Sequence, residues 1–207
     1  MKILADSHSK FKILYYENVD IDGLWVRYDF ARLIAKYGKK QSYQRAHEWC
    51  SGHGAIGFEI LASKLCEHLV LTDCYAPAAQ GCEFTAAANN IQHKTTVYNC
   101  DRLSDIPVTE KWDLFVANPP WWFNLSTPNQ DYERKMVDTQ WRTHRDLYTN
   151  IRQYLTNDAD VFVYEDSAAT DPDFWQDWYQ NAGLKLVDVH HNFGITETGY
   201  VLHLKCI

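Results

Sequence analysis

The chain has 207 residues, 46% of them apolar and 23% charged, and a formal net charge of −7. This length suits one domain with a sizeable hydrophobic core and a small extension. The acidic balance differs from that of proteins that hold nucleic acid by its phosphates, because those contacts need Lys and Arg. The densest basic run is typical of a solvated helix face. It consists of Arg32, Lys36, Lys39, Lys40 and Arg45.

The six cysteines form no C-x-x-C pair, and no His follows them at the spacing of a metal site. The N-terminus lacks the long apolar core of a signal peptide, and no stretch reaches the length of a membrane span. These features predict a cytoplasmic protein with reduced, mostly buried thiols, no bound metal and no membrane contact.

Residues 1–45 precede the first clear strand, and their aromatic residues include Trp25, Tyr28 and Phe30. We expect this N-terminal segment to cover a ligand site or, alternatively, the edge of a sheet. In residues 46–207, short apolar runs alternate with helical patterns. Strands are predicted at 46–50, 69–72, 95–99, 112–117, 161–164, 184–189 and 199–204, and helices at 55–65, 76–89, 139–155 and 173–181.

This alternation predicts an α/β fold with a mostly parallel, seven-stranded sheet that carries helices on both faces. The last two strands have no helix between them, so we expect an antiparallel C-terminal strand. In such sheets, ligands bind beyond the carboxyl ends of the strands, where the strand order reverses. The functional residues are therefore expected at the ends of the first four strands.

The first strand runs into a glycine-rich stretch, in which Glu48, Cys50, Gly52 and Gly54 occupy alternate positions. Glycines let the backbone turn sharply and approach a ligand closely. Gly57 completes a G-x-G-x-x-G spacing, so this stretch alone leaves a nicotinamide site open.

Acidic residues follow the next two strands. Asp73 could accept hydrogen bonds from a ribose diol, or it could cap the following helix. Asp101 could accept a hydrogen bond from the exocyclic amine of a bound adenine, or it could cap a turn. Each residue alone allows both interpretations.

The fourth strand ends in Asn118-Pro119-Pro120-Trp121, where the prolines must stop the strand. Asn-Pro is a common turn dipeptide, and Trp121 and Trp122 could simply be a core pair. A functional interpretation is favoured because three further signals lie upstream in the expected order.

Four segments in order resemble the motifs of class I S-adenosylmethionine-dependent methyltransferases: EWCSGHGAIGF, LTD, VYNCD and WDLFVANPPW. The N-P-P-[YFW] form resembles the branch that methylates planar nitrogens. That branch includes release-factor glutamine methyltransferases, the methyltransferase small domain enzymes that act on rRNA guanine-N2, and adenine-N6 methyltransferases. The resemblance covers roughly residue 46 to the C-terminus and implies a Rossmann-like methyltransferase fold.

The resemblance also implies the functional residues. S-adenosylmethionine would be held by Glu48, Cys50, Gly52, Gly54, Asp73, Asp101 and Asn118. Catalysis would fall to Asn118, Pro119, Pro120 and Trp121. The Asn118 side-chain oxygen and the Pro119 carbonyl would accept from the two N–H groups of the acceptor, and Trp121 would stack on its plane.

The sequence departs from the family pattern in three places. Glu48 stands where Asp is commoner, and His53 stands where a small residue is more usual. About 45 residues before the first strand are too few for the separate N-terminal helical domain of the release-factor enzymes. A release-factor substrate is therefore less expected.

The predicted reaction is N-methylation of an amide or exocyclic amine, and the acidic balance favours a protein or small-molecule acceptor. A nucleobase of RNA or DNA is the alternative, and it would have to be single-stranded or flipped to reach the pocket. A catalytically inactive partner protein with the same fold would have no need of the N-P-P-W motif. A nicotinamide oxidoreductase would leave Pro119 and Pro120 unexplained.

Overall fold

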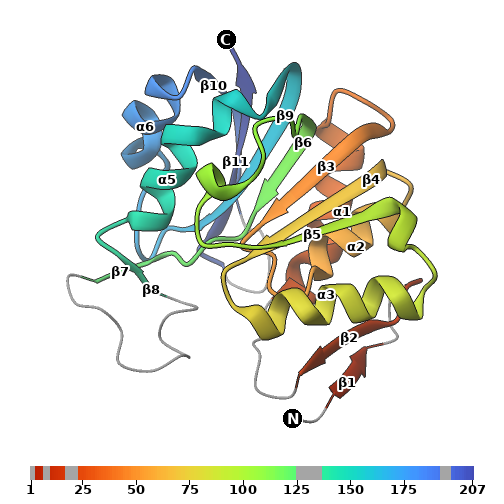
Figure 1. Ribbon diagram of the computed structural model, residues 1–207. Helices are drawn as coiled ribbons and strands as arrows, with labels where there is room; N and C mark the ends of the chain where they lie inside the picture. Colours follow the sequence, from red (N-terminus) through yellow and green to blue (C-terminus); the bar gives the residue numbers. More distant parts are fainter. Residues whose placement is uncertain (1–2, 7–9, 17–22, 125–136, 192–196) are drawn as a thin grey trace.

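The computed structural model describes residues 3–6, 10–16, 23–124, 137–191 and 197–207 (Figure 1). Its centre is a seven-stranded sheet in the order β10-β11-β9-β6-β3-β4-β5. The strands are β3 (Tyr43–Trp49), β4 (Cys66–Asp73), β5 (Thr95–Asn99), β6 (Trp112–Ala117), β9 (Leu155–Asp166), β10 (Leu184–His191) and β11 (Gly199–Cys206).

The sheet is parallel except at β11, which pairs antiparallel with both β9 and β10. From β3 the chain moves outward to β4 and β5, and it then returns to add β6 and β9 on the other side. The strand order therefore reverses between β3 and β6, where Trp49 pairs with Ala117. The predicted mostly parallel sheet and its antiparallel C-terminal strand are confirmed.

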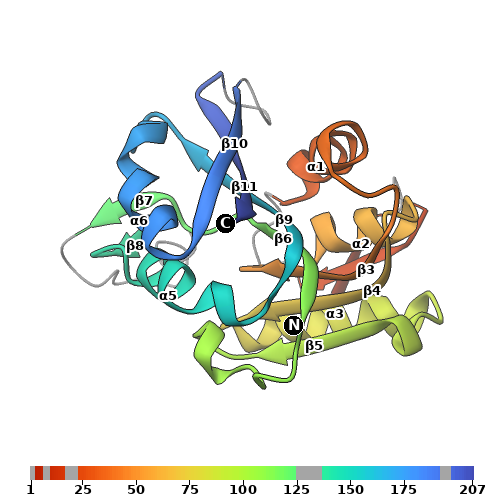
Figure 2. The same ribbon diagram turned by 90° about the horizontal axis from the view of Figure 1, so that it is seen from above.

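Helices cover both faces of the sheet (Figure 2). One face carries α1 (Gly23–Tyr37), α2 (Ala55–Ala62) and α3 (Ala76–Ala88), and the other carries α5 (Arg142–Asn150) and α6 (Gln176–Asn181). Short 3-10 helices are η1 (Gln92–Lys94), η2 (Leu103–Asp105), η3 (Ile151–Gln153) and η4 (Pro172–Trp175).

Side-chain alternation along the strands supplies both cores. In β6, Leu114 and Val116 enter the core under α1 and α2, whereas Phe115 and Ala117 enter the core under α5. Because β6 is buried on both faces, it reads in the sequence as a continuous apolar run.

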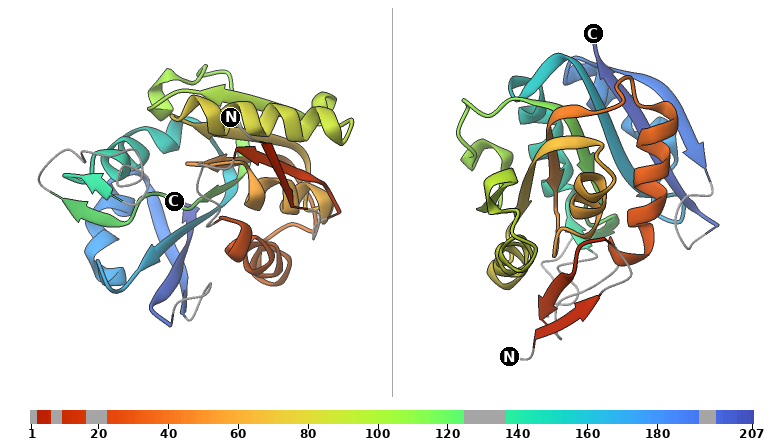
Figure 3. Two further views of the ribbon diagram at one scale, coloured as in Figure 1. Left: turned by 90° about the horizontal axis from the view of Figure 1, so that it is seen from below. Right: turned by 90° about the vertical axis from the view of Figure 1, so that its right-hand side faces the viewer.

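The N-terminal segment forms a two-stranded antiparallel hairpin of β1 (Ile3–Asp6) and β2 (Ile13–Tyr16), followed by α1 (Figure 3). Side chains of α3 hold β2: the Leu14 N–H donates to Thr85 Oγ1 at 2.8 Å, and the Asn89 amide exchanges two 2.9 Å hydrogen bonds with the Lys12 backbone. Phe30 of α1 is fully buried. The side chain of Trp25 lies outside the described part of the chain.

The helix predicted at 55–65 ends at Ala62, and the one at 173–181 is divided between η4 and α6. The helix predicted at 139–155 is wrong in its bounds. The structure divides 139–155 into the end of β8 (Val137–Thr139), α5, η3 and the start of β9. Leu147, Ile151, Tyr154 and Leu155 fall at helical spacing because all four pack into the same core while the backbone changes conformation beneath them. β8 pairs in parallel with β7 (Trp122–Asn124), a pair that the sequence did not predict.

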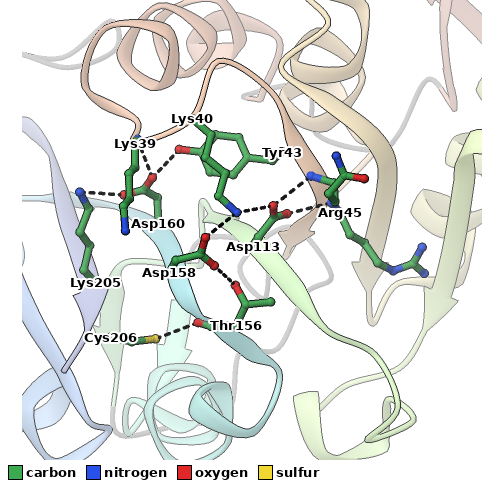
Figure 4. A network of polar contacts seen from close by, with 11 residues as sticks. Lys39, Lys40, Tyr43, Arg45, Asp113, Thr156, Asp158, Asp160, Lys205 and Cys206 are labelled. Atoms are coloured by element: carbon green, nitrogen blue, oxygen red, sulfur yellow. Dashed lines mark hydrogen bonds and ion pairs between the residues drawn. The ribbon is translucent and has the colours of Figure 1, made fainter.

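A polar network joins the sheet near the amino ends of β3 and β6 (Figure 4). The buried carboxylate of Asp160 accepts hydrogen bonds from the Tyr43 hydroxyl and from the Lys39 N–H at 2.8 Å. Asp113 accepts from Lys40 Nζ at 2.8 Å and from the Arg45 N–H at 2.8 Å. The network closes the edge of the sheet opposite to the glycine-rich loop.

The described residues contain no cluster of three or more His, Cys, Asp or Glu side chains that could hold a metal ion. In the same part of the chain, no helix is long and apolar enough to cross a membrane. All six cysteines are free thiols.

Candidate functional site

The loop between β3 and α2 makes a tight turn at the point where the strand order reverses. Cys50, Gly52 and Gly54 have φ angles of 55°, 52° and 74°. A Cβ on Gly54 would lie 2.9 Å from Leu71 Cδ1, so no side chain fits there, whereas a Cβ on Gly52 would meet nothing within 4 Å. The backbone at Gly52 therefore faces open space, which lets a ligand approach it closely.

Asp73, at the end of β4, holds this loop in place. Its Oδ2 accepts the Gly52 N–H at 2.7 Å, and its Oδ1 accepts the Tyr75 N–H at 2.8 Å. Tyr75 is the residue before α3, so Asp73 braces both the glycine loop and the start of that helix. The carboxylate is only partly buried.

Glu48 and Cys50 support the loop from beneath. Glu48 is buried, and its Oε2 accepts the Gly57 N–H at 2.7 Å. Burial raises the pKa of Glu48 to about 8, so the carboxyl is mostly protonated at neutral pH. Burial also raises the pKa of the Cys50 thiol well above its usual value. The structure places both as uncharged groups that shape the loop.

Asp101, after β5, is exposed and forms a bidentate ion pair with Arg142 at the start of α5. Arg142 Nη1 lies 2.7 Å from Asp101 Oδ2, and Nη2 lies 3.0 Å from Oδ1. Asn99 donates to the carbonyls of Asp73 and Cys74 at 2.9 and 3.1 Å, which ties the ends of β4 and β5 together. The sequence did not predict the partner of Asp101.

The N-P-P-W stretch lies between the glycine loop and the end of β9. Ala117, the residue before Asn118, pairs with Trp49 on one side and with Val163 on the other. Asn118 is half-buried, and its side chain has no hydrogen-bond partner among the described residues.

The two indoles after the prolines lie together. Trp121 packs partly against the core under α1 and α2, and its ring centroid is 4.8 Å from that of Trp122. Trp122 is 42% exposed. Trp122 therefore backs Trp121 from the solvent side and does not pack in the core.

A buried His144 lies between two carboxylates on the other face of the sheet. Its Nδ1 is 2.6 Å from Asp138 Oδ2 of β8, and its Nε2 is 2.9 Å from Glu165 Oε1 of β9. All three side chains are at most 1% exposed. The sequence did not predict this cluster, because the three residues come from three elements and form no local motif.

The sequence places the chain in a known family. Residues 30–143, more than half of the chain, match the family model of the methyltransferase small domain. The chain belongs to this family. A comparison with curated proteins gives no match.

Solved structures of several methyltransferases share this fold. The ribosomal protein L11 methylase of Lactobacillus delbrueckii subsp. bulgaricus is 18% identical, with a TM-score of 0.62 over 87% of this chain and 78% of that one. A Pyrococcus horikoshii protein assigned as an RNA methyltransferase is 12% identical, with a TM-score of 0.65 over 93% and 92%. A tRNA methyltransferase of B. subtilis is 10% identical, with a TM-score of 0.59 over 86% and 65%.

The family and the fold together identify this methyltransferase small domain protein as an S-adenosylmethionine-dependent methyltransferase of class I. The predicted Rossmann-like fold and enzyme class are confirmed. S-adenosylmethionine is the usual cofactor of the family. The similar structures act on different macromolecules, so the fold does not identify the acceptor of this chain.

Proposed function

We propose that this methyltransferase transfers the methyl group to a planar nitrogen, an amide or an exocyclic amine, of a protein or small-molecule acceptor. The observation that carries the proposal is the position of Asn118. Its amide has no hydrogen-bond partner among the described residues, it directly follows Ala117, which pairs with Trp49 at the reversal of strand order, and two prolines and a partly buried indole follow it.

The residues at the strand ends fit the cofactor that the family uses. Gly52 offers open backbone, and Asp73 can accept from ribose hydroxyls while it braces the loop. Asp101 is exposed toward solvent, where it could accept from an adenine amine. Glu48, Cys50 and Gly54 act indirectly by fixing the loop. When bound, S-adenosylmethionine supplies a methyl group activated by its sulfonium.

The chemistry of a planar nitrogen explains the motif. Its lone pair is delocalised, and rehybridisation toward a tetrahedral geometry localises it. Acceptors placed on the two N–H groups favour that geometry as positive charge develops. We assign these acceptors to the Asn118 side-chain oxygen and the Pro119 carbonyl, with the Pro120 ring limiting backbone motion. Trp121 would stack on the plane of the acceptor.

The charge distribution supports a protein or small-molecule acceptor. Of the basic run between residues 32 and 45, Lys40 is paired with Asp113 and Asp158, and Arg45 is paired with Glu110. Both lie at the edge of the sheet opposite to Asn118. Arg142, which lies nearer the site, is paired with Asp101. A flipped or single-stranded nucleobase remains the second candidate, because similar folds methylate RNA.

We also propose that the N-terminal segment covers the cofactor. The ring of Tyr15 in β2 contacts His53 of the glycine loop edge-on, with centroids 5.3 Å apart. The hairpin therefore reaches the loop that would hold the cofactor, and His53 supplies the contact where a smaller residue could not.

The test compares two variants. Asn118→Ala should lower methyl transfer by at least about 100-fold while S-adenosylhomocysteine affinity stays within a few-fold, because its lost contacts go to the acceptor. Asp73→Ala should weaken S-adenosylhomocysteine binding instead. Transfer is measured from labelled S-adenosylmethionine into protein, RNA, DNA and small-molecule fractions, and affinity by calorimetry. Full activity of Asn118→Ala would refute the mechanism, and labelling of RNA or DNA alone would select the second candidate.

A further inference from the structure

The buried Asp138, His144 and Glu165 cluster connects the segment after the N-P-P-W motif to the central sheet. Strand β7 begins at Trp122, directly after the motif, and its Phe123 pairs with Asp138 of β8. Asp138 contacts His144, and His144 contacts Glu165 of β9. β9 in turn pairs with β6, which leads into Asn118. These contacts form a closed ring that runs from the motif through β7, β8, His144 and β9 to β6 and back to the motif.

The register places the end of this ring beside the proposed acceptor groups. Val163 pairs with Ala117, so Glu165 lies two residues further along β9, at the level of Pro119. Val163 and Ala117 both enter the core under α5. Because side chains alternate along a strand, Glu165 points to that same face. The Glu165 side chain therefore lies in the core under α5, on the α5 face of the sheet, and does not contact the acceptor itself.

The turn between β8 and α5 is held in an unusual backbone conformation. Gln140 and Trp141 have φ angles of 54° and 56°, in the left-handed region that residues other than glycine seldom occupy. Asp138 compensates by accepting the backbone N–H groups of Thr143 and His144 at 2.9 and 3.1 Å. Strained conformations of this kind persist where surrounding contacts determine them fully, as at ligand clamps.

Aromatic packing ties the same turn to β7. The Trp141 ring lies 5.3 Å from Phe123, 5.3 Å from His144 and 5.1 Å from Trp175, measured between centroids. Phe123 is the neighbour of Trp122, which backs Trp121. Displacement of His144 would thus be passed through Trp141 and Phe123 to the indoles of the motif.

The cluster works only when His144 carries two protons, because each ring nitrogen must donate to a carboxylate. Burial lowers the pKa of His144, but the attraction of Glu165 and Asp138 outweighs it and raises the pKa to about 9. Burial also raises the pKa of Glu165 itself. Other titratable groups near the cluster in the described part of the chain include Tyr148 of α5, whose pKa is raised by burial, Tyr200 of β11, and Arg142 and Cys50, which interact with Asp138.

We propose that Asp138, His144 and Glu165 are positioning residues, which fix β7 and hence the geometry of Pro119 and Trp121 toward the acceptor. The role of these residues in methyl transfer rests on the proposed function. The anchoring of β7 is independent of the proposed function, because it concerns only how firmly the backbone of β7 is held. The glycine loop lies between β3 and α2, where Asp73 of β4 holds it, and Asp138, His144 and Glu165 make no hydrogen bond to it among the described residues.

The experiment uses Glu165→Gln, which keeps the shape of the side chain but removes its charge. Hydrogen exchange of the amides in residues 116–124, corrected for the intrinsic rate, should be at least tenfold faster at pH 7.5 than in the wild type. Calorimetry should show S-adenosylhomocysteine affinity within about threefold of wild type. Asp160→Asn is the matched control, because it also removes a buried carboxylate charge beside a histidine, His203, at 2.9 Å.

A second measurement serves if Glu165→Gln does not fold. In the wild type, protection of residues 116–124 should fall as the pH rises through about 9, since His144 then loses one of its two donors. In a folded Glu165→Gln variant that midpoint should move to lower pH. A general loss of stability would change the far-UV circular dichroism signal. The shift in the midpoint of local protection should instead occur while that signal stays constant.

The outcomes separate the two proposals. Unchanged exchange in residues 116–124, or an equal change in Asp160→Asn, would overturn the positioning role. Faster exchange with a reduced kcat toward the fraction that the wild type labels would support it in full. Faster exchange in a protein that labels no fraction would keep the anchor and reject the proposed transfer reaction.

Discussion

Two glycines at the start of α2 should tolerate a methyl group very differently. At Gly52 a Cβ would meet nothing within 4 Å, but the φ of 52° makes an alanine there costly by about 1–2 kcal/mol. Gly52→Ala should therefore fold, with weakened S-adenosylhomocysteine binding, because the methyl group fills space that the cofactor would use. Calorimetry and urea unfolding measure the two effects.

Gly57→Ala is the contrasting variant. Its Cβ would lie 2.6 Å from Glu48 Oε2 and 2.7 Å from Leu69 Cδ1, both inside the core. We expect a loss of unfolding free energy of at least about 2 kcal/mol from overpacking. For the first variant, Gly52→Ala, binding of S-adenosylhomocysteine as tight as in the wild type would show that the open space at Gly52 does not belong to the cofactor site.

At the scale of residues, the sequence predicted which side chains reach the carboxyl edge but not how they pair. Asp73 braces the glycine loop and also accepts the N–H of Tyr75, the residue before α3, whereas its contact with a ribose stays a prediction. The partner of Asp101 is Arg142, which lies 41 positions away. Local spacing carries no information about such contacts, because they depend on how α5 packs against the sheet.

The hairpin of β1 and β2 should depend on one hydroxyl of α3. Thr85 is fully buried, and its Oγ1 accepts the Leu14 N–H at 2.8 Å and donates to the Leu14 carbonyl at 3.3 Å. Thr85→Val removes both hydrogen bonds at nearly constant shape and leaves backbone groups unpaired. We expect a loss of about 1–3 kcal/mol in urea unfolding.

Ser42→Ala is the control for that loss, because its contact with Glu67 is exposed and 3.5 Å long. It should change the unfolding free energy by less than about 0.5 kcal/mol. Equal stability of Thr85→Val and the wild type would mean that the hairpin is held by packing alone.

At the scale of elements, prediction succeeded where the hydrophobic pattern was long or regular. Strands 95–99 and 112–117 match β5 and β6 without change. The short strands β1, β2, β7 and β8 have three or four residues each, too few for a period of two to be recognised. The predicted helix at 139–155 was too long because one apolar face continues through α5, η3 and β9.

At the scale of the whole molecule, the two edges of the sheet differ in chemistry. The carboxyl edge holds open backbone at Gly52 and an Asn118 amide that has no partner within the described ranges of the chain. The amino edge holds Asp113 and Asp160, whose carboxylates are saturated with donors. The order of strands and helices predicts the carboxyl edge as the ligand site, since the reversal rule depends on topology alone, and the assignment of this edge stays a prediction. The polar network at the other edge depends on tertiary packing and could not be predicted.

This network should make stability depend on acid. Burial raises the pKa of Asp160, but hydrogen bonds from His203, Tyr43 and Lys39 outweigh it and lower the pKa to about 2. The unfolded chain has an Asp pKa of about 3.9, so below that pH the unfolded state binds a proton that the folded state does not. The contribution of Asp160, about 2.5 kcal/mol, is therefore nearly complete above about pH 5 and is lost progressively as the pH falls from about 5 to 1.

Asp160→Asn tests this assignment through the shape of the stability curve. The variant should be less stable than the wild type at pH 7, because the donors of His203, Tyr43 and Lys39 lose a charged acceptor. Since the variant has no proton to gain at this position, the difference should shrink by about 1.8 kcal/mol between pH 4 and pH 2. Urea unfolding followed by tryptophan fluorescence at half-unit pH steps measures the difference. A constant difference over that interval would show that Asp160 titrates normally in the folded protein and that the network stabilises the amino edge by packing, not by charge.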